Sequence, residues 1–294
     1  MAPTSTACLT LSRRLARSLL IVFLLFVLPT HAAWGALPFT ADEDPADSQK
    51  TRILLLGQSP DGHPATTHEY MAGQRILRKL LEPYPSLEVS IVNADSPWED
   101  GPDQLRQADV VVLFLSEGAR WMNENPRRLQ AFAELAQRKG GLVGLHWAVG
   151  TKEAKNIDPF VQLLGACHGG PDRKHGVFET KLDIDPAEHS IARGIEPLEV
   201  KEEFYYALKR TKDADGFASV MIANIEGTPE TVAWAWTRPD GGRSFGFTGL
   251  HFHDNWRHEA YRRLVVQGIL WTCDLEIPEE GVDVSIDPQL LKLP

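Results

Sequence analysis

The chain has 294 residues, and 40 acidic residues against 30 lysines and arginines give it a formal charge of -10. Such an acidic chain lacks the cationic surface that phosphate backbones require, so we do not expect nucleic acid as a partner. Three cysteines are too few for a disulfide scaffold, and the chain must therefore be held together mainly by a hydrophobic core.

The first 35 residues have the pattern of a secretory signal peptide. Arginines at positions 13, 14 and 17 precede an apolar run over residues 19–28, and small residues follow. Cleavage after Ala32 and cleavage after Gly35 both fit. The run is too short to span a bilayer, so membrane contact is expected only if the segment stays uncleaved. We expect an exported protein, periplasmic or extracellular.

Residues 36–50 are acidic and contain proline, which is typical of a flexible leader. Two cysteines, Cys167 and Cys273, follow the signal segment. Export makes a disulfide between them chemically possible, and the sequence leaves their pairing open.

From residue 51 onward, strand and helix patterns alternate as they do in parallel α/β units. Short continuous apolar runs fit strands that are buried on both faces. The first half predicts strands at 53–56, 87–92, 110–115 and 142–146 and helices at 70–81 and 126–139. The second half predicts strands at 177–184, 219–223, 231–236 and 244–252 and a closing helix at 256–271.

This order predicts an α/β fold with a doubly wound, mainly parallel sheet and helices on both faces. No linker or repeat divides the sequence, so we expect one domain over 51–275, followed by a C-terminal tail at 276–294.

The glycine-rich segment 140–150 runs from an expected strand into a tight turn that contains His146. Small residues at positions 144 and 148 flank the turn, as in the nucleophile elbow of class I glutamine amidotransferase-like domains, which it resembles. Histidine stands where those domains have cysteine, so thiolate-dependent glutaminase chemistry is not expected. The alternative is a buried structural histidine at a strand end.

Several segments occur in an order that is found in one known family: 52–57 with His68, the 140–150 elbow, 160–165 with His168, 189–195, 202–205 and 242–251. In these segments the chain resembles the ThuA-like (trehalose utilisation) family of the class I glutamine amidotransferase-like superfamily. The family more often has His-Pro-Ile and Asp-Glu-x-Tyr where this chain has residues 189–191 and 202–205. The resemblance implies a flavodoxin-like, amidotransferase-like fold and a link to disaccharide or keto-sugar metabolism.

Histidines supply the candidate metal ligands. His251 and His253 lie two residues apart at the end of an expected strand, which would place both on one face. With His68 and His146, and with Glu203 as the carboxylate, they would suit zinc, manganese or iron. Glu202 is the alternative carboxylate, and histidines that only form hydrogen bonds are the alternative to a metal site.

The polar loop 167–175 is a candidate for ligand binding, because His168 and either Arg173 or Lys174 would face an oxygen-rich or anionic group. A plain surface turn is the alternative. The aromatic residues Trp147 and Tyr205 are candidates for stacking on the apolar face of a sugar, although most large aromatics belong to a core.

Two functions follow from this reading. One is an exported enzyme that acts on a sugar or keto-sugar, with His146 as general base or metal ligand and Glu203 as acid, base or ligand. The other is a carbohydrate-binding or partner-binding module without turnover. A cysteine hydrolase is the weakest reading, because neither cysteine stands at the elbow. The oligomeric state is left open.

Overall fold

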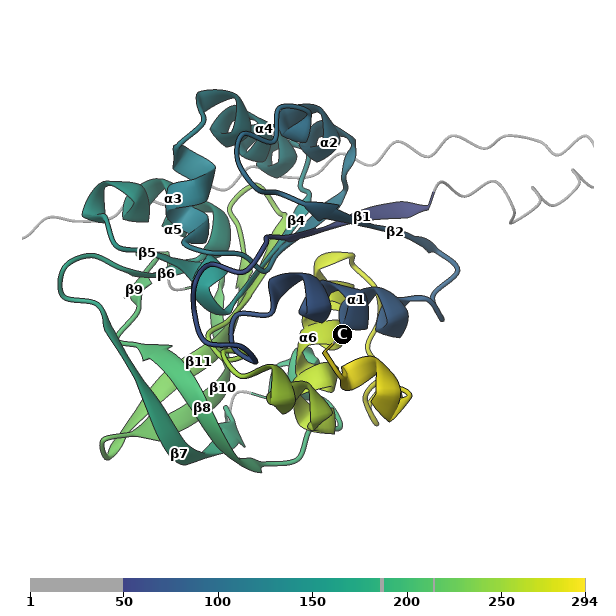
Figure 1. Cartoon of the computed structure of the whole chain (residues 1–294), viewed down its shortest axis with the longest axis vertical. Helices are drawn as coiled ribbons and strands as arrows, with labels where there is room; N and C mark the ends of the chain where they lie inside the picture. Colours follow the sequence, from purple (N-terminus) through teal and green to yellow (C-terminus); the bar gives the residue numbers. More distant parts are fainter. Residues whose placement is uncertain (1–49, 186–187, 214, 294) are drawn as a thin grey trace, which may run out of the picture. The chain divides into compact units, whose positions relative to one another are not determined.

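Figure 1 presents a computed structural model of the chain, which describes residues 50–185, 188–213 and 215–293. The expected signal segment and all but the last residue of the expected leader lie outside these ranges. No helix within them is long and apolar enough to cross a membrane.

A large central sheet organises the domain. Its parallel half contains β1 (Thr51–Gly57), β2 (Leu87–Asn93), β3 (Val110–Leu113), β4 (Gly141–Leu145) and β12 (Arg243–Phe247). Its antiparallel half contains β7 (Lys174–Ile184), β8 (Leu198–Tyr206), β10 (Phe217–Ile225) and β11 (Thr228–Thr237). The order is β2-β1-β3-β4-β12-β11-β10-β7-β8. A second sheet joins β5 (Gly150–Thr151), β6 (Ala166–Gly169) and β9 (Lys209–Arg210).

Helices cover both faces of the parallel half, as Figure 1 shows. One face packs against α1 (Tyr70–Leu81) and α6 (Glu259–Thr272), and the other against α2 (Gly101–Gln107), α3 (Gly118–Asn123), α4 (Pro126–Gln137) and α5 (Ile157–Leu164). Successive residues of β1 supply the two cores in turn, because strand side chains alternate between faces. The predicted doubly wound α/β fold is confirmed.

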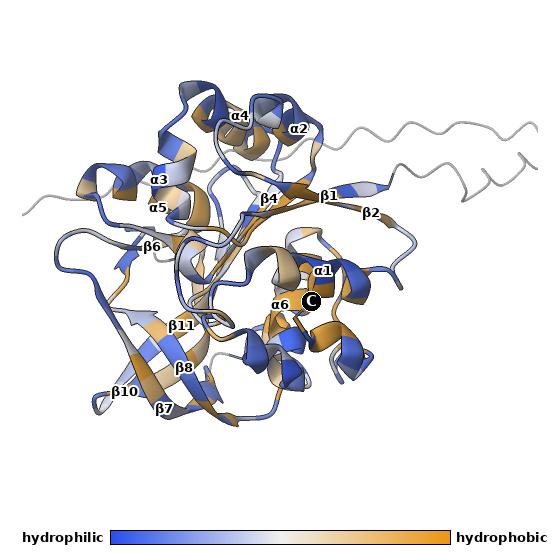
Figure 2. Ribbon diagram, viewed as in Figure 1, coloured by the Kyte–Doolittle hydropathy of each residue, from blue (hydrophilic) through white to orange (hydrophobic). Residues whose placement is uncertain are grey.

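Hydrophobic residues follow this layering. In Figure 2, orange residues mark part of α6, whereas blue residues gather on the turns of α2 and α4. Every residue of β3 is buried, which explains why its sequence is a continuous apolar run.

The segment expected to be a C-terminal tail packs against α6. Its side chains Ile277, Val282 and Val284 are buried. Arg262 donates from Nε to the carbonyl oxygen of Val284 at 2.9 Å, and the N–H of Val282 donates to Oε1 of Gln267 at 2.9 Å. Residues 277–284 thereby complete the core on this side of the sheet.

A titratable residue lies at the start of a short 3-10 turn, Ser190–Ala192. Nδ1 of His189 accepts the N–H of Ile191 at 3.2 Å. Burial, together with the charge of Arg243, lowers the pKa of His189 to about 4, whereas the unfolded chain keeps a value of about 6.5. The unfolded state therefore binds more protons between these values. The stability contributed by neutral His189 is fully present above pH 6.5 and is lost as the pH falls through 4.

We expect the free energy of unfolding to fall by about 1–2 kcal/mol more in the unsubstituted protein than in His189→Asn between pH 7 and pH 4, a range reduced for the partial exposure of the ring. Asparagine keeps an acceptor for the cap and does not titrate. Urea unfolding at several pH values measures the difference, and identical pH dependence of the two proteins would contradict the assignment.

Candidate histidine site

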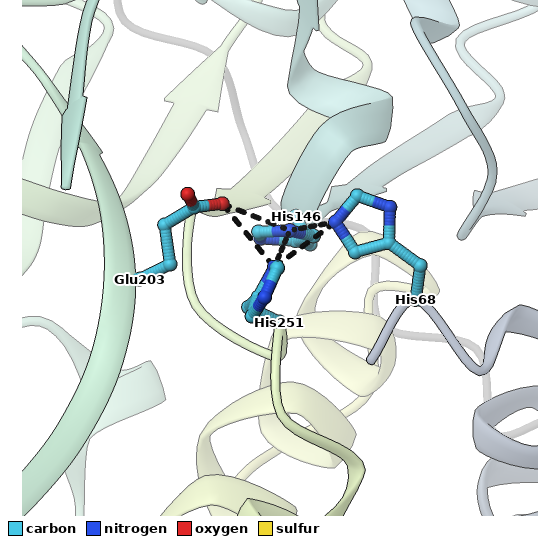
Figure 3. A group of neighbouring side chains, drawn as sticks. All are labelled: His68, His146, Glu203 and His251. Carbon is cyan, nitrogen blue, oxygen red and sulfur yellow. Dashed lines mark hydrogen bonds and ion pairs between the residues drawn. The ribbon is translucent and has the colours of Figure 1, made fainter. Parts of the chain in front are cut away.

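Parallel strands bring three histidines to one edge of the sheet. His68 lies in the connection after β1, His146 directly follows β4, and His251 lies shortly after β12. Strands β4 and β12 are hydrogen-bonded neighbours. Ligand sites in doubly wound sheets lie beyond the carboxyl ends of such strands, and this is where the three imidazoles meet (Figure 3).

The backbone at His146 is strained. Its φ of 50° lies in the left-handed region, which side-chain-bearing residues seldom adopt. Gly118 lets α3 approach this turn, because a Cβ there would lie 2.1 Å from the carbonyl oxygen of Ala148. His68, with a φ of 53°, and Leu250, with a φ of 80°, are strained in the same way. Strain of this kind concentrates at functional sites.

The polar atoms of the cluster are close together. Nε2 of His146 lies 2.9 Å from Nε2 of His68 and 3.3 Å from Nδ1 of His251, and these two nitrogens are 3.0 Å apart. Glu203 on β8 brings Oε2 to 3.2 Å from Nδ1 of His251 and 3.7 Å from Nε2 of His146. The hydroxyl of Tyr205 lies 3.1 Å from Nε2 of His146. Figure 3 shows the three rings and Glu203 converging on one point.

His146 and His68 each make a hydrogen bond on the side of the ring that faces away from the cluster, and these bonds determine which ring nitrogen carries the lone pair. Nδ1 of His146 donates to the carbonyl oxygen of Thr248 at 2.9 Å, and Nδ1 of His68 donates to Oδ2 of Asp61 at 2.9 Å. Both partners can only accept, and a neutral imidazole carries one N–H. The two Nε2 atoms therefore turn lone pairs toward each other across 2.9 Å, an arrangement that a shared cation would stabilise.

The protonation states suit a cation. Burial, and then the neighbouring His68 and His251, lower the pKa of His146 well below its usual value. Burial also lowers the pKa of His68, against the opposing influence of Asp61. Burial alone would raise the pKa of Glu203, but its hydrogen bond to His251 and the nearby His146 lower it to about 2. At neutral pH the two imidazoles are neutral and Glu203 is ionised, as metal ligands must be.

The separations also fit a metal ion. One ligand atom each from His68, His146, Glu203 and His251 lies within 4.8 Å of the others. Nitrogen ligands about 2.1 Å from a common ion are roughly 3.0–3.4 Å apart in octahedral or tetrahedral geometry. Three imidazoles and one carboxylate are a donor set that zinc, manganese and iron accept.

His253 does not belong to this group, contrary to the expectation that it would share a face with His251. The expected strand 244–252 is too long, because β12 ends at Phe247 and the chain turns at Leu250. His253 begins the 3-10 helix His253–Arg257. Its Nε2 lies 2.9 Å from the carbonyl oxygen of Leu291, so its ring contacts the C-terminal segment.

A cavity of ≈ 230 Å³ opens beside the cluster. Each of the four residues expected to bind substrate lines it; these are Trp147, His168, Arg173 and Tyr205. Lys174, the alternative to Arg173, is exposed and is not among the lining residues. This volume is below the roughly 300–1,000 Å³ of sites for drug-sized ligands, and it suits a ligand of about one sugar ring.

Tyr205 faces histidines with its ring. The ring stacks on His146 with centroids 4.8 Å apart and on His168 with centroids 4.2 Å apart. The expected stacking of this ring on a sugar is therefore replaced by stacking on imidazoles. Burial, and then the charge of Glu203, raise the pKa of Tyr205 well above its usual value, so its hydroxyl stays protonated.

His168 is buried yet has no partner for either ring nitrogen among the described residues. Burial, and then the charges of His175 and Arg173, lower the pKa of His168 to about 3. A buried polar group without a hydrogen bond is costly and calls for an explanation. His168 lines the cavity, which makes its ring a candidate for contact with a bound ligand.

Sequence reasoning overlooked residues that support the cluster. Asp61 contacts His68, accepts the hydroxyl of Tyr70 at 2.8 Å and lies 2.7 Å from Nδ1 of His63. Carboxylates that orient a ligand histidine in this way raise its basicity. The sequence feature that could have identified them is an acidic residue and a histidine in the loop after the first strand, at the edge of the sheet where ligands bind.

The two cysteines are both free, which settles the pairing that the sequence left open. Burial raises the pKa of the Cys167 thiol, and burial together with Asp109 raises that of Cys273 to about 12. Protonated thiols are poor nucleophiles, which argues against a cysteine hydrolase.

Solved structures of two other proteins resemble the fold of this chain. A putative ThuA-like protein from Bacteroides uniformis is 13% identical, with a TM-score of 0.60 over 79% of this chain and 94% of that chain. A second, from Parabacteroides merdae, is 16% identical, with a TM-score of 0.56 over 76% of this chain and 90% of that chain. At these identities the likeness concerns the fold alone. No curated protein matches the chain.

The sequence match decides the family. Residues 61–272 match ThuA, described as trehalose utilisation. This span is most of the chain, and it includes the three clustered histidines and Glu203. The chain belongs to the ThuA family.

Proposed function

We propose that this chain is a metal-dependent enzyme of carbohydrate metabolism that acts on a sugar or keto-sugar outside the cytoplasm. The observation that carries the proposal is the meeting of three imidazole nitrogens and one ionised carboxylate beside a cavity. The expected export rests on the arginine and apolar pattern of residues 1–35. The link to sugars rests on the trehalose utilisation family.

A divalent metal in this cluster would polarise a carbonyl or hydroxyl oxygen of the sugar. His68, His146, Glu203 and His251 would hold it. Nε2 of His146 has one lone pair, because Nδ1 donates to Thr248. One lone pair cannot serve as both a metal ligand and a general base. If His146 holds the metal, another residue would have to act as the base.

Other residues of the cavity have roles that follow from their chemistry. The protonated hydroxyl of Tyr205 lies 3.1 Å from Nε2 of His146 and would donate to a substrate oxygen there. Trp147 offers an apolar wall for the C–H face of a sugar. His168 offers one N–H donor and one acceptor nitrogen, and either of them would suit a sugar hydroxyl group, which both donates and accepts.

Turnover of sugars tests the proposal. The metal-loaded protein, incubated with disaccharides and keto-sugars, is expected to give new products in proton NMR spectra. His146→Ala is expected to give none, while His189→Ala, which replaces a histidine outside the cluster, keeps the activity. Sugar binding without any product would support a carbohydrate-binding module instead.

A further inference from the structure

The cavity beside the histidine cluster differs in charge from the rest of the molecule. The chain carries a formal charge of -10, yet two cationic side chains, Lys152 and Arg173, line the cavity against one carboxylate, Glu203. A cationic side chain without an acidic partner attracts an oxyanion. Whether the cavity favours an anionic ligand therefore depends on what its charged groups already bind.

Neighbouring histidines engage the carboxylate. Oε2 of Glu203 lies 3.2 Å from Nδ1 of His251, and Oε1 lies 3.2 Å from Nδ1 of His175. Both oxygens of Glu203 thus have partners, and this carboxylate does not pair with either cation of the cavity.

The two cations differ in what they already bind. Nζ of Lys152 lies 3.5 Å from Oε1 of Glu117, so this ammonium group has an acidic partner. Arg173 has none among the described residues. Its guanidinium makes one hydrogen bond there, from Nη1 to the carbonyl oxygen of Gly170 at 3.3 Å. A guanidinium has five N–H donors in a planar fork, so most of the fork remains available to a ligand.

His168 supplies an independent sign of a ligand. Its side chain is 1% exposed and lines the same cavity, and neither ring nitrogen has a partner within the described ranges. A molecule that carries an oxyanion and a hydroxyl group would provide a partner for both side chains, with the oxyanion bound to Arg173 and the hydroxyl group bound to His168.

We propose that the cavity binds an anionic sugar, whose carboxylate or phosphate pairs with Arg173 while a hydroxyl group bonds to His168. The proposal rests on the proposed function in that it takes the ligand to be a sugar. The cavity of ≈ 230 Å³ holds a single ring with such a substituent.

Calorimetric titration of the metal-loaded chain with three probes tests this proposal. Glucose, glucuronate and glucose 6-phosphate share one ring and differ at carbon 6, so they separate the neutral sugar, the carboxylate and the phosphate. We expect at least one anionic probe to bind at least about tenfold more tightly than glucose. The tighter of the two anions identifies which oxyanion the site takes.

Matched variants assign the effect to Arg173. Arg173→Gln is expected to weaken binding of the favoured anion at least about tenfold. Lys174→Gln removes the same charge from the next residue, which is exposed and does not line the cavity, and should change affinity less than about twofold. Equal effects of the two variants, glucose binding as tightly as both anions, or no binding of any probe at millimolar concentration would each overturn the proposal.

Metal content and turnover, measured on the same samples, separate the two proposals. Anion binding that depends on Arg173 in a protein without metal or turnover would leave the anion site standing and reject the enzyme. Turnover of neutral sugars that is unchanged in Arg173→Gln would support the enzyme and reject the anion site.

Discussion

We expect the protein purified without an affinity tag to carry close to one divalent metal ion per chain, and His146→Ala to carry almost none. Removal of this ligand leaves His68, His251 and Glu203, and it opens a gap at the nitrogen that lies within 3.3 Å of both other imidazoles. Even residues that only orient a metal ligand change affinity about 10–100-fold, so loss of a ligand itself should exceed about 100-fold. Elemental analysis by mass spectrometry gives the stoichiometry and names the metal.

His253→Ala is the matched control for this measurement. It removes an imidazole two residues from His251 whose Nε2 lies at the carbonyl oxygen of Leu291 instead of at the cluster. Its metal content should equal that of the unsubstituted chain. Equal metal in His146→Ala, with circular dichroism showing that the variant is folded, would reject the metal site and leave His146 as an acid, base or structural residue.

The fold was predictable because its parallel half follows simple rules. Buried strands such as β3 are continuous apolar runs, and the amphipathic pattern of α1 gave its bounds, Tyr70–Leu81, without error. The short helices α2, α3 and α5 were missed, since six to eight residues give too few turns for a periodic signal.

Strand β8 was missed for a different reason. Its inward positions are Val200, Glu202 and Phe204, and all three are buried. A buried glutamate in the middle of this face makes the alternation of apolar and polar residues unrecognisable. Glu202, which supports the site, therefore prevented recognition of the strand that carries Glu203 and Tyr205.

The site itself was partly predictable. His68, His146, His251 and Glu203 were named from the matching family segments, and the structure brings them together. The position of His253 was not predictable from spacing, because the extended conformation ends before that residue. A two-residue spacing places side chains on one face only while the strand lasts.

The second large effect is expected at Glu202, because its carboxylate accepts hydrogen bonds from the loop that carries His251. Its oxygens accept the N–H groups of Leu250 at 2.8 Å and His251 at 3.1 Å, and the side-chain amide of Asn255 at 3.0 Å. Burial raises the pKa of Glu202 to about 6, although these donors and the N–H of Glu203 oppose the shift. Its side chain is fully buried, so the carboxylate serves as the internal anchor of this strained turn.

We expect Glu202→Ala to lower the free energy of unfolding by about 3–5 kcal/mol, because it leaves several buried donors without an acceptor. Glu199→Ala is the control: it removes a carboxylate from an exposed position on the same strand and should cost less than about 0.5 kcal/mol. Urea unfolding compares the two. A loss below about 1 kcal/mol in Glu202→Ala would show that the turn holds its shape without the anchor. A folded Glu202→Ala protein should also bind metal more weakly than Glu199→Ala. The reason is that the backbone N–H groups bound by Glu202 belong to the turn at His251.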